Sequence, residues 1–292
     1  MKPEFNNGRF FVSPILGCEG RCLYCYLIIN NYKKPYANTF DIDDTIEYMK
    51  KHKDFVSGKN GTIISVGAWG DLFPSSNELR RHSIRWIKEL LSLENPLQIM
   101  SKNELTDEEI DEITASIKYK NQLLYSTTII TFDFFGTIEK GLSDPFKRLL
   151  VLKKFAKKAV PINIMIKPFI PNITKTEMFI KELENMPEIH CVVGKLYVDE
   201  AILNNLIRNE ELKEIIGNNF FDDTGQISCV KDNILNTYND KVIEDFISQL
   251  IGKNIKVFKK SSCVNANILK QKNKNMEKYK SEGFCMNCGN CM

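Results

Sequence analysis

Long apolar runs are absent from this sequence of 292 residues, and so is a strong charge of either sign. A membrane-spanning helix needs about 18 or more consecutive apolar residues, and no run reaches that length. Residues 1–8 lack the apolar core of a signal peptide, so we expect a cytoplasmic protein. The 40 basic and 37 acidic residues give a net charge of +3, which is not the broad basic footprint of a protein that binds duplex nucleic acid.

Histidine is scarce as well, and its three copies show no His-x3-His spacing, so we interpret them as structural. Cysteine, in contrast, occurs nine times. A reducing compartment disfavours disulfides, so clustered thiols there indicate metal ligation. The cysteines form two groups at opposite ends of the chain and an isolated pair between them: Cys18, Cys22 and Cys25; Cys191 and Cys229; and Cys263, Cys285, Cys288 and Cys291.

The first group reads Cys18-Glu-Gly-Arg-Cys22-Leu-Tyr-Cys25, a Cys-x3-Cys-x2-Cys spacing. When the intervening residues form a tight loop, three such thiols can bind one iron–sulfur cluster and leave a four-iron cluster one ligand short. The alternatives are a zinc loop or three unrelated buried thiols. Zinc usually takes four protein ligands in structural sites, so three thiols with no fourth nearby fit zinc poorly.

This spacing, the preceding Gly17 and the aromatic Tyr24 resemble the radical S-adenosylmethionine (SAM) superfamily. The resemblance implies that Cys18, Cys22 and Cys25 bind a [4Fe-4S] cluster whose fourth iron is chelated by the amino and carboxyl groups of SAM. It further implies that an electron from the cluster cleaves SAM to methionine and a 5'-deoxyadenosyl radical.

Apolar runs alternate with amphipathic stretches along the first two thirds of the chain. We expect strands at residues 9–16, 62–67, 97–101, 123–128, 161–166 and 189–193, with helices between them. This alternation predicts an α/β fold, a partial (β/α)6 barrel over residues 1–197. Residues 198–292 would form an extension with helices at 201–216 and 233–250 and a cysteine-rich tail.

Active sites of such barrels lie at the carboxyl ends of the strands. Five residues that follow or end predicted strands would therefore share one mouth: Cys18, Asp71, Lys102, Ser126 and Lys167.

Five later stretches narrow the resemblance to the spore photoproduct lyase-like branch of the superfamily. They are Gly70-Asp-Leu-Phe-Pro-Ser, Ile99-Met-Ser-Lys102, Leu124-Tyr-Ser126-Thr-Thr, Pro145-Phe-Lys-Arg-Leu149 and Lys167-Pro-Phe-Ile-Pro-Asn. Together they cover roughly residues 9–195 in the expected order. Gly70 and Leu72 depart from the Thr and Pro of that branch, which alters the local loop.

By this resemblance Tyr24 lies beside the adenine of SAM. The segment Trp69-Gly70-Asp71 would receive the methionine amino group, Lys102 its carboxylate and Ser126 the ribose. These roles suit the chemistry, because carbonyls or a carboxylate bind an ammonium group, a lysine binds a carboxylate and a hydroxyl bonds a sugar oxygen. For Lys102 and Ser126 the alternative is ordinary polar surface.

The second cysteine group reads Cys285-Met-Asn-Cys288-Gly-Asn-Cys291, with Cys263 as the upstream fourth ligand. Ferredoxins hold a four-iron cluster with Cys-x2-Cys-x2-Cys and a further cysteine elsewhere. Four-thiolate zinc is the competing interpretation. We therefore predict a second [4Fe-4S] cluster or a zinc ion at the tail. For Cys191 and Cys229 the alternatives are a buried thiol or a hydrogen donor to a product radical, and Cys229 is the better donor candidate.

We therefore predict a radical SAM enzyme, a lyase by its resemblance to the spore photoproduct lyase-like branch, that abstracts hydrogen from a small or nucleobase-like substrate. A deazapurine is one candidate, in a reaction similar to that of queuine lyase. A reducing partner such as flavodoxin or ferredoxin would supply the electron. The alternatives are a DNA lesion repair lyase, which needs a basic and aromatic cleft, and a non-catalytic metalloprotein that does not bind SAM.

Overall fold

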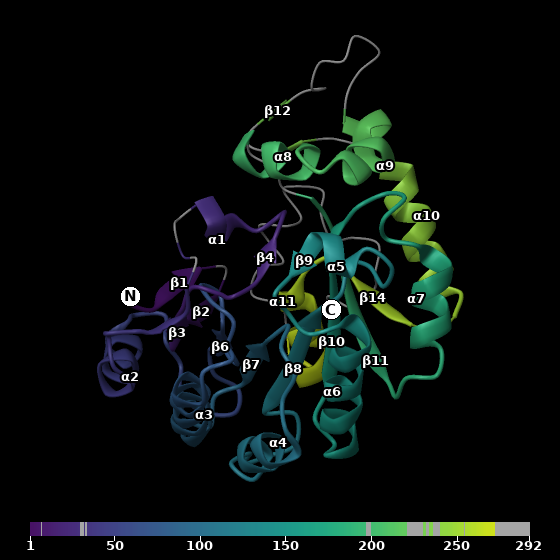
Figure 1. The fold of residues 1–292 in the computed structure, drawn as a ribbon. Helices are drawn as coiled ribbons and strands as arrows, with labels where there is room; N and C mark the ends of the chain where they lie inside the picture. Colours follow the sequence, from purple (N-terminus) through teal and green to yellow (C-terminus); the bar gives the residue numbers. More distant parts are fainter. Residues whose placement is uncertain are drawn as a thin grey trace.

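The computed structural model describes residues 1–6, 8–29, 32, 34–196, 200–220, 230–231, 234–235, 240–253 and 255–271. Within these ranges the chain forms an eight-stranded sheet in the order β1-β2-β6-β7-β8-β10-β11-β14 (Figure 1). The bounds of its strands are Glu4–Asn6, Arg9–Val12, Ile63–Val66, Leu97–Met100, Leu123–Thr128, Ile162–Phe169, Ile189–Lys195 and Lys256–Phe258. The β1 strand pairs antiparallel with β2, and the other neighbours pair parallel.

All six predicted barrel strands are present, and the mostly parallel sheet confirms the predicted α/β fold class. The first strand is shorter than predicted. It ends at Val12, and residues Ile15–Leu16 form a separate strand, β3, that pairs antiparallel with β5, Tyr36–Ala37. The chain therefore bends between β2 and β3 just before the first cysteine.

Amphipathic helices cover the outer face of the sheet (Figure 1). They are α2 Ile42–Lys51, α3 Asn77–Ser92, α4 Asp107–Thr114, α6 Pro145–Lys157, α7 Thr176–Leu183 and α10 Asp240–Ile251. Side chains of Asp41, Ser76, Thr106 and Asp144 accept backbone N–H bonds at the starts of four of them, which satisfies donors that have no partner inside the helix. Tyr125 of β8 stacks on Phe155 of α6 with ring centroids 4.2 Å apart.

The opposite face of the sheet packs against a helix that follows the last strand. This helix, α11, spans Ser261–Leu269, and its apolar side chains meet Leu124, Val192 and Phe258. It begins just after the carboxyl end of β14. Asn121 Nδ2 donates to Ile268 O at 3.3 Å, and Gln271 Nε2 donates to Asn60 Oδ1 at 3.1 Å. Because both partners precede strands, α11 runs from the carboxyl end of the sheet toward its amino end.

The part of the chain after residue 198 differs from the helical extension that we predicted. Its strand β14 pairs parallel with β11, so the sheet continues across the predicted boundary. The helix predicted at 201–216 is two helices, α8 Glu200–Ile207 and α9 Glu210–Phe220. Asn209 Oδ1 accepts from Leu212 N at 3.0 Å and so begins a new helix. The second predicted helix starts only at Asp240, after a short pair of strands, β12 Val230–Lys231 and β13 Ile234–Leu235.

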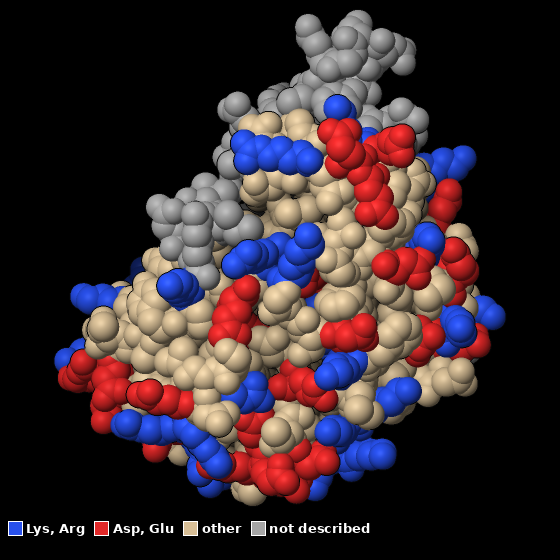
Figure 2. All heavy atoms as spheres, viewed as in Figure 1, with Lys and Arg blue, Asp and Glu red and all other residues tan. Residues whose placement is uncertain are grey.

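Four short elements lie at the carboxyl end of the sheet. They are β4 Arg21–Cys22, α1 Tyr26–Ile29 and a segment in which α5, Phe135–Ile138, leads directly into β9, Glu139–Lys140. None of the helices in the described ranges combines the length and apolar composition that a membrane crossing requires. On the face shown in Figure 2, basic and acidic side chains are interspersed, as the near-neutral net charge predicts.

Candidate active site at the cysteine loop

Two glycines hold the cysteine loop against the end of β6. Gly17 N donates to Trp69 O at 2.8 Å, and Gly17 forms an isolated parallel bridge with Gly70. A Cβ atom at Gly70 would lie 2.5 Å from the carbonyl oxygens of both Gly17 and Ile15. Gly17 has φ +84°, and a Cβ there would lie 2.1 Å from Lys34 O. Only glycine permits this close approach of the two backbones.

The three thiols of the loop differ in exposure. Cys22 is buried, whereas Cys18 and Cys25 are half-buried. Cys25 N donates to Cys22 O at 3.0 Å, which closes the turn between them. Burial, together with the charge of Asp71, raises the pKa of Cys18 to about 12. Burial also raises the pKa of Cys22 to about 11, although Lys102 acts in the opposite direction. Without a metal, both groups are therefore neutral thiols at pH 7.

The surroundings of these thiols suit an iron–sulfur cluster. Gly20 N donates to Cys18 Sγ at 3.2 Å, and Lys102 Nζ lies 3.4 Å from Cys22 Sγ. Such donors stabilise the thiolates that iron requires. In the part of the chain that the structure describes, no three Cys, His, Asp or Glu side chains meet closely enough to hold a single ion.

A buried carboxylate that sequence reasoning missed lies beside the loop. Strands β4 and β9 pair antiparallel with Cys22 opposite Glu139, and Glu139 has no exposed surface. Its Oε1 accepts from Lys102 Nζ at 2.9 Å and from the Tyr24 hydroxyl, and its Oε2 accepts from Arg148 Nη1 at 2.6 Å. Burial alone would raise the pKa of Glu139, but the charges of Lys102 and Arg148 outweigh it and lower the pKa to about 2.

The ammonium group of Lys102 already has three acceptors within the protein. Besides Glu139 and Cys22, Nζ donates to the Tyr24 hydroxyl at 2.6 Å, and it lies 4.7 Å from the centre of the Tyr24 ring. Burial lowers the pKa of Lys102, but Cys22, Glu139 and Tyr24 outweigh it, so the net direction is upward and the group stays charged. Three acceptors match the three donors of an ammonium group. To bind the carboxylate of SAM, Lys102 must exchange one of these partners.

Arg148 fixes the far side of Glu139. Its Nε donates to Ser143 O at 2.7 Å and its Nη1 donates to Thr128 O at 2.8 Å, and the side chain is buried. Arg148 belongs to the Pro145–Leu149 stretch through which the sequence resembles the spore photoproduct lyase-like branch. Its position joins helix α6 and the end of β8 to the cysteine loop.

Asp71 clamps the loop that carries Lys102. Its Oδ1 accepts from Ser101 Oγ at 2.6 Å and from Phe73 N at 3.0 Å, and its Oδ2 accepts from Lys102 N at 2.8 Å. Both carboxylate oxygens are therefore engaged by the loops after β6 and β7. The predicted contact of Asp71 with the amino group of SAM stays a prediction, and the structure gives Asp71 a positioning role beside it.

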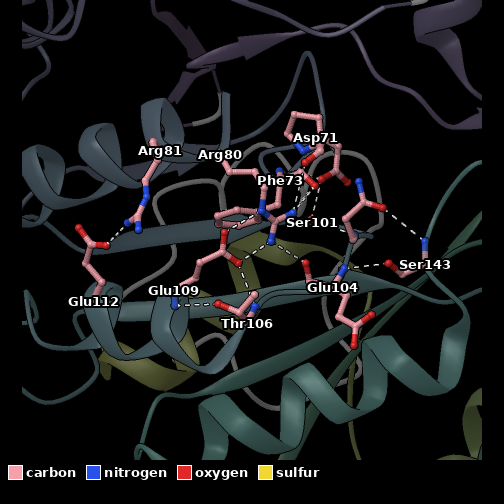
Figure 3. A network of polar contacts seen from close by, with 12 residues as sticks. Asp71, Phe73, Arg80, Arg81, Ser101, Glu104, Thr106, Glu109, Glu112 and Ser143 are labelled. Atoms are coloured by element: carbon pink, nitrogen blue, oxygen red, sulfur yellow. Dashed lines mark hydrogen bonds and ion pairs between the residues drawn. The ribbon is translucent and has the colours of Figure 1, made fainter. Parts of the chain in front are cut away.

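A second missed residue, Arg80 of α3, ties the same two loops together (Figure 3). Its Nη1 donates to Phe73 O and its Nη2 to Glu104 O, both at 2.9 Å. Its Nε donates to Glu109 Oε1 at 2.7 Å, and Glu109 also completes the capping box of α4 with Thr106. Figure 3 shows these groups converging from α3, α4 and the two loops.

The remaining predicted SAM contacts lie on either side of this network. The Trp69 ring packs edge-on against Tyr26 with centroids 5.8 Å apart, so it flanks the cysteine loop. Ser126 has no exposed surface, and its Oγ accepts from Gln98 Nε2 at 3.0 Å and from Asn163 Nδ2 at 3.2 Å. Ser126 therefore belongs to a polar layer on the inner face of the sheet, and its contact with a ribose stays a prediction.

The tail cysteines Cys285, Cys288 and Cys291 lie outside the described residues, as does Cys229. The second metal site and the hydrogen-donor role therefore stay predictions. Cys263 is fully buried in α11 within the apolar group that contains Val192 and Phe258. Cys191 is also fully buried, in β11, in agreement with the buried-thiol alternative.

Solved structures share this architecture at low sequence identity. Spore photoproduct lyase with bound AdoMet and dinucleoside spore photoproduct superposes with a TM-score of 0.61 at 15% identity, over 87% of this chain and 78% of that chain. The same enzyme complexed with dinucleoside spore photoproduct gives a TM-score of 0.62 at 14% identity, with the same coverage. The chain has the fold of spore photoproduct lyase.

This likeness confirms the fold expected from the resemblance to that branch of the radical SAM superfamily. Streptococcus suis SuiB bound to S-adenosylmethionine superposes with a TM-score of 0.53 at 13% identity, over 90% of this chain and 53% of that chain. No family model and no curated protein matches the chain.

The residues that sequence reasoning missed share one property, which is that no short motif marks them. Glu139 stands between an apolar residue and a lysine after a loop, and Arg80 is one of two adjacent arginines on α3. Only the fold shows that Arg80 faces inward while Arg81 faces solvent, with side-chain exposures of 13% and 68%.

Proposed function

We propose that this chain is a radical SAM enzyme that reductively cleaves SAM and abstracts hydrogen from a bound substrate. The observation that carries the proposal is the loop of Cys18, Cys22 and Cys25 at the carboxyl end of the sheet. Lys102 and the half-buried Tyr24 lie beside it, in a fold shared with proteins solved with SAM bound.

When bound, a [4Fe-4S] cluster supplies one electron to SAM, whose cleavage yields methionine and a 5'-deoxyadenosyl radical. The chain's own residues prepare this chemistry. Lys102 and Gly20 N place hydrogen-bond donors at two of the ligand sulfurs, which stabilises their thiolate form. Glu139 and Arg148 keep Lys102 charged and oriented. Helix α11 packs against the inner face of the sheet, and we expect this packing to limit the water and other hydrogen donors that could reach a radical.

The substrate class that we favour is a small or nucleobase-like molecule, because the net charge is only +3. A deazapurine, cleaved in a reaction similar to that of queuine lyase, is one member of that class. The dinucleoside bound to spore photoproduct lyase favours a second candidate, a lesion-repair lyase acting on a DNA photoproduct. A flavodoxin or ferredoxin would serve as reductant in either case.

The tail cysteines carry a further part of the proposal. We retain a second [4Fe-4S] cluster or a zinc ion at Cys285, Cys288 and Cys291, with Cys263 as the fourth ligand. Cys263 lies on α11 in an apolar environment. For Cys263 to be the fourth ligand, the tail cysteines must therefore lie next to this helix.

The test is anaerobic reconstitution followed by metal analysis and a SAM-cleavage assay with dithionite. We expect 5'-deoxyadenosine from the wild type and none from the Cys18→Ala/Cys22→Ala/Cys25→Ala variant, which should lose about four irons. The matched control is Cys191→Ala, a buried cysteine outside the loop, which should keep both the iron and the activity. A wild type that holds a full cluster yet never cleaves SAM, with any candidate substrate added, would leave only the non-catalytic alternative.

A further inference from the structure

Two exposed cations lie side by side on the outer face of the β4–β9 ribbon, the antiparallel pair of β4 and β9. Its register places Arg21 opposite Lys140 and Cys22 opposite Glu139. Directly opposite residues share one face of such a pair, and successive residues along a strand alternate faces. Cys22 and Glu139 are buried, whereas Arg21 and Lys140 are exposed. Figure 2 shows basic side chains where Figure 1, in the same view, draws β4 and β9. The Arg21–Lys140 pair therefore faces solvent on the side of the ribbon opposite to the Cys22 thiol.

The chain that leaves β9 packs directly on the cysteine loop. Gly141 has φ +80°, and a Cβ atom there would lie 2.8 Å from Glu19 O. A Cβ atom at Gly20 would lie 2.7 Å from Leu142 Cγ. The two segments are therefore too close for a larger residue at either glycine. Strand β9 and the two residues after it thus cover one side of the loop.

Neither cation of the Arg21–Lys140 pair is neutralised within the part of the chain that the structure describes. Among those residues, neither side chain forms a hydrogen bond or an ion pair. Glu19, the acid of the same loop, is engaged elsewhere, because Ser75 N and Ser75 Oγ donate to its carboxylate at 2.9 Å and 2.5 Å. Like charges directly opposite each other across two strands are destabilising. The pair is therefore unfavourable for the chain alone, which indicates a role in contact with an anionic partner.

We propose that the Arg21–Lys140 pair is a docking site for an acidic protein of the flavodoxin or ferredoxin class that donates one electron to the cluster. Charge complementarity supports this partner, because flavodoxins and ferredoxins have surfaces rich in carboxylates, and opposite charges steer two proteins together. Position supports it as well. A partner on this face would be separated from the Cys22 thiol by little more than the β4 backbone, and electron transfer slows steeply with distance. The inference rests on the proposed function, because it needs a cluster at the cysteine loop.

The two faces of the β4–β9 ribbon would then serve different molecules. The buried face carries Glu139, which accepts from Lys102 Nζ at 2.9 Å and from the Tyr24 hydroxyl, and this is the side on which we expect SAM. The exposed face would receive the electron donor. No covalent bond forms or breaks in this step. One electron leaves the reduced flavin or iron–sulfur centre of the partner and one enters the cluster, so the partner is oxidised and the cluster is reduced by one electron.

The first test is calorimetric titration of the anaerobically reconstituted full-length protein with oxidised flavodoxin and, separately, with oxidised ferredoxin at low ionic strength. We expect one saturable site for at least one of them, with an affinity that falls as salt is added. Arg21→Gln/Lys140→Gln should weaken this binding by about tenfold, because two steering charges are lost. The matched control is Arg85→Gln/Lys120→Gln, which removes an exposed arginine of α3 and an exposed lysine before β8. It should change the affinity by less than about twofold.

Lys140→Gln alone is the second variant, because it leaves residues 18–25 unchanged and so separates docking from cluster assembly. Its iron content should equal that of the wild type. Stopped-flow absorbance then follows reduction of the cluster by the reduced partner. Lys140→Gln should lower the second-order rate constant by about threefold, since one of the two steering charges remains.

A single-stranded oligonucleotide is titrated in parallel, because nucleic acid is the competing polyanion, although it needs a broader basic surface than one pair. Oligonucleotide binding that depends on the Arg21–Lys140 pair, with partner binding that does not, would overturn the inference. So would equal partner affinities of the wild type and both double variants, or no saturable binding of either protein. SAM cleavage with dithionite separates the two proposals. Cleavage without pair-dependent docking rejects the docking site alone, and pair-dependent docking without cleavage rejects the proposed function alone.

Discussion

Cys22 faces Glu139 across the antiparallel pair of β4 and β9. A fully buried carboxylate next to a cysteine that we propose as a cluster ligand is unfavourable unless cations neutralise it. Lys102, which follows β7, and Arg148 of α6 supply those cations. Lys102 Nζ lies 2.9 Å from Glu139 Oε1, and Arg148 Nη1 lies 2.6 Å from Glu139 Oε2. The cysteine loop is thus held by a charge network whose members are far apart in the sequence.

Replacing Glu139 by Gln should destabilise the protein by about 3–5 kcal/mol, because it leaves the buried Arg148 and the half-buried Lys102 without their carboxylate. Anaerobic denaturant unfolding measures this loss. Glu104→Gln is the matched control, since Glu104 forms an exposed ion pair with Lys147, with side-chain exposures of 44% and 58%. It should change stability by less than about 0.5 kcal/mol. Equal effects of the two substitutions would contradict the network.

Arg80→Gln should weaken SAM binding, because Arg80 joins the loops that carry Asp71 and Lys102. It should also lower stability by about 2–4 kcal/mol through the loss of a largely buried, hydrogen-bonded charge. The neighbouring Arg81→Gln removes an exposed ion pair with Glu112 and should leave both quantities nearly unchanged. SAM affinity is measured by equilibrium dialysis of the unreduced protein. If Arg81→Gln had the larger effect, the assignment of Arg80 would be wrong.

Gly70→Ala should reduce iron incorporation, because its Cβ would meet two backbone carbonyl oxygens at 2.5 Å and push the cysteine loop away from β6. The cost in stability should be about 1–3 kcal/mol, as for other overpacked sites. Gly136→Ala is the control, since a Cβ at Gly136 meets no atom within 4 Å. Iron content and far-ultraviolet circular dichroism are compared after identical reconstitution. Full iron loading of the Gly70→Ala variant would contradict this prediction, because the cysteine loop would then bind iron without its close contact with Gly70.

The lowered pKa of Lys167 predicts that the free energy of unfolding depends on pH. Its pKa falls from 10.5 to about 8 in the folded protein, so between these values the unfolded chain binds a proton that the folded chain has lost. This contribution makes the folded state more stable as pH rises from about 8 to about 10.5. The stability gained by Lys167→Met over the wild type should therefore shrink across that range. A difference between the two proteins that stays constant across that range would contradict the lowered pKa of Lys167.

Local sequence signals predicted the repeating part of the fold. Several strands of the barrel coincide with apolar runs in the sequence, and β8, which begins with such a run, is buried at all six positions. Ser, Thr and Asp are residue types that commonly begin helices, and Ser76, Thr106 and Asp144 each satisfy a free backbone N–H group at a helix start in the structure. The cysteine spacing likewise located the candidate site.

Elements set by distant contacts were not predictable in this way. Strand β14 is only three residues long and is recognisable as part of the sheet only through its pairing with β11. Glu139 reads as an ordinary exposed acid until β9 pairs with β4 and buries it. Lys102 was predicted from the resemblance, but its bond to Glu139 depends on a contact that no local pattern encodes.

In the function that we propose, SAM binds at an open iron held by Cys18, Cys22 and Cys25. Electron paramagnetic resonance of the dithionite-reduced protein, titrated with SAM, reports on that iron. We predict the signal of a reduced four-iron cluster that shifts on adding SAM, and that this response disappears in the Cys18→Ala/Cys22→Ala/Cys25→Ala variant but persists in Cys191→Ala. A wild-type cluster signal that SAM leaves unchanged at saturating concentration would contradict SAM binding at the cluster.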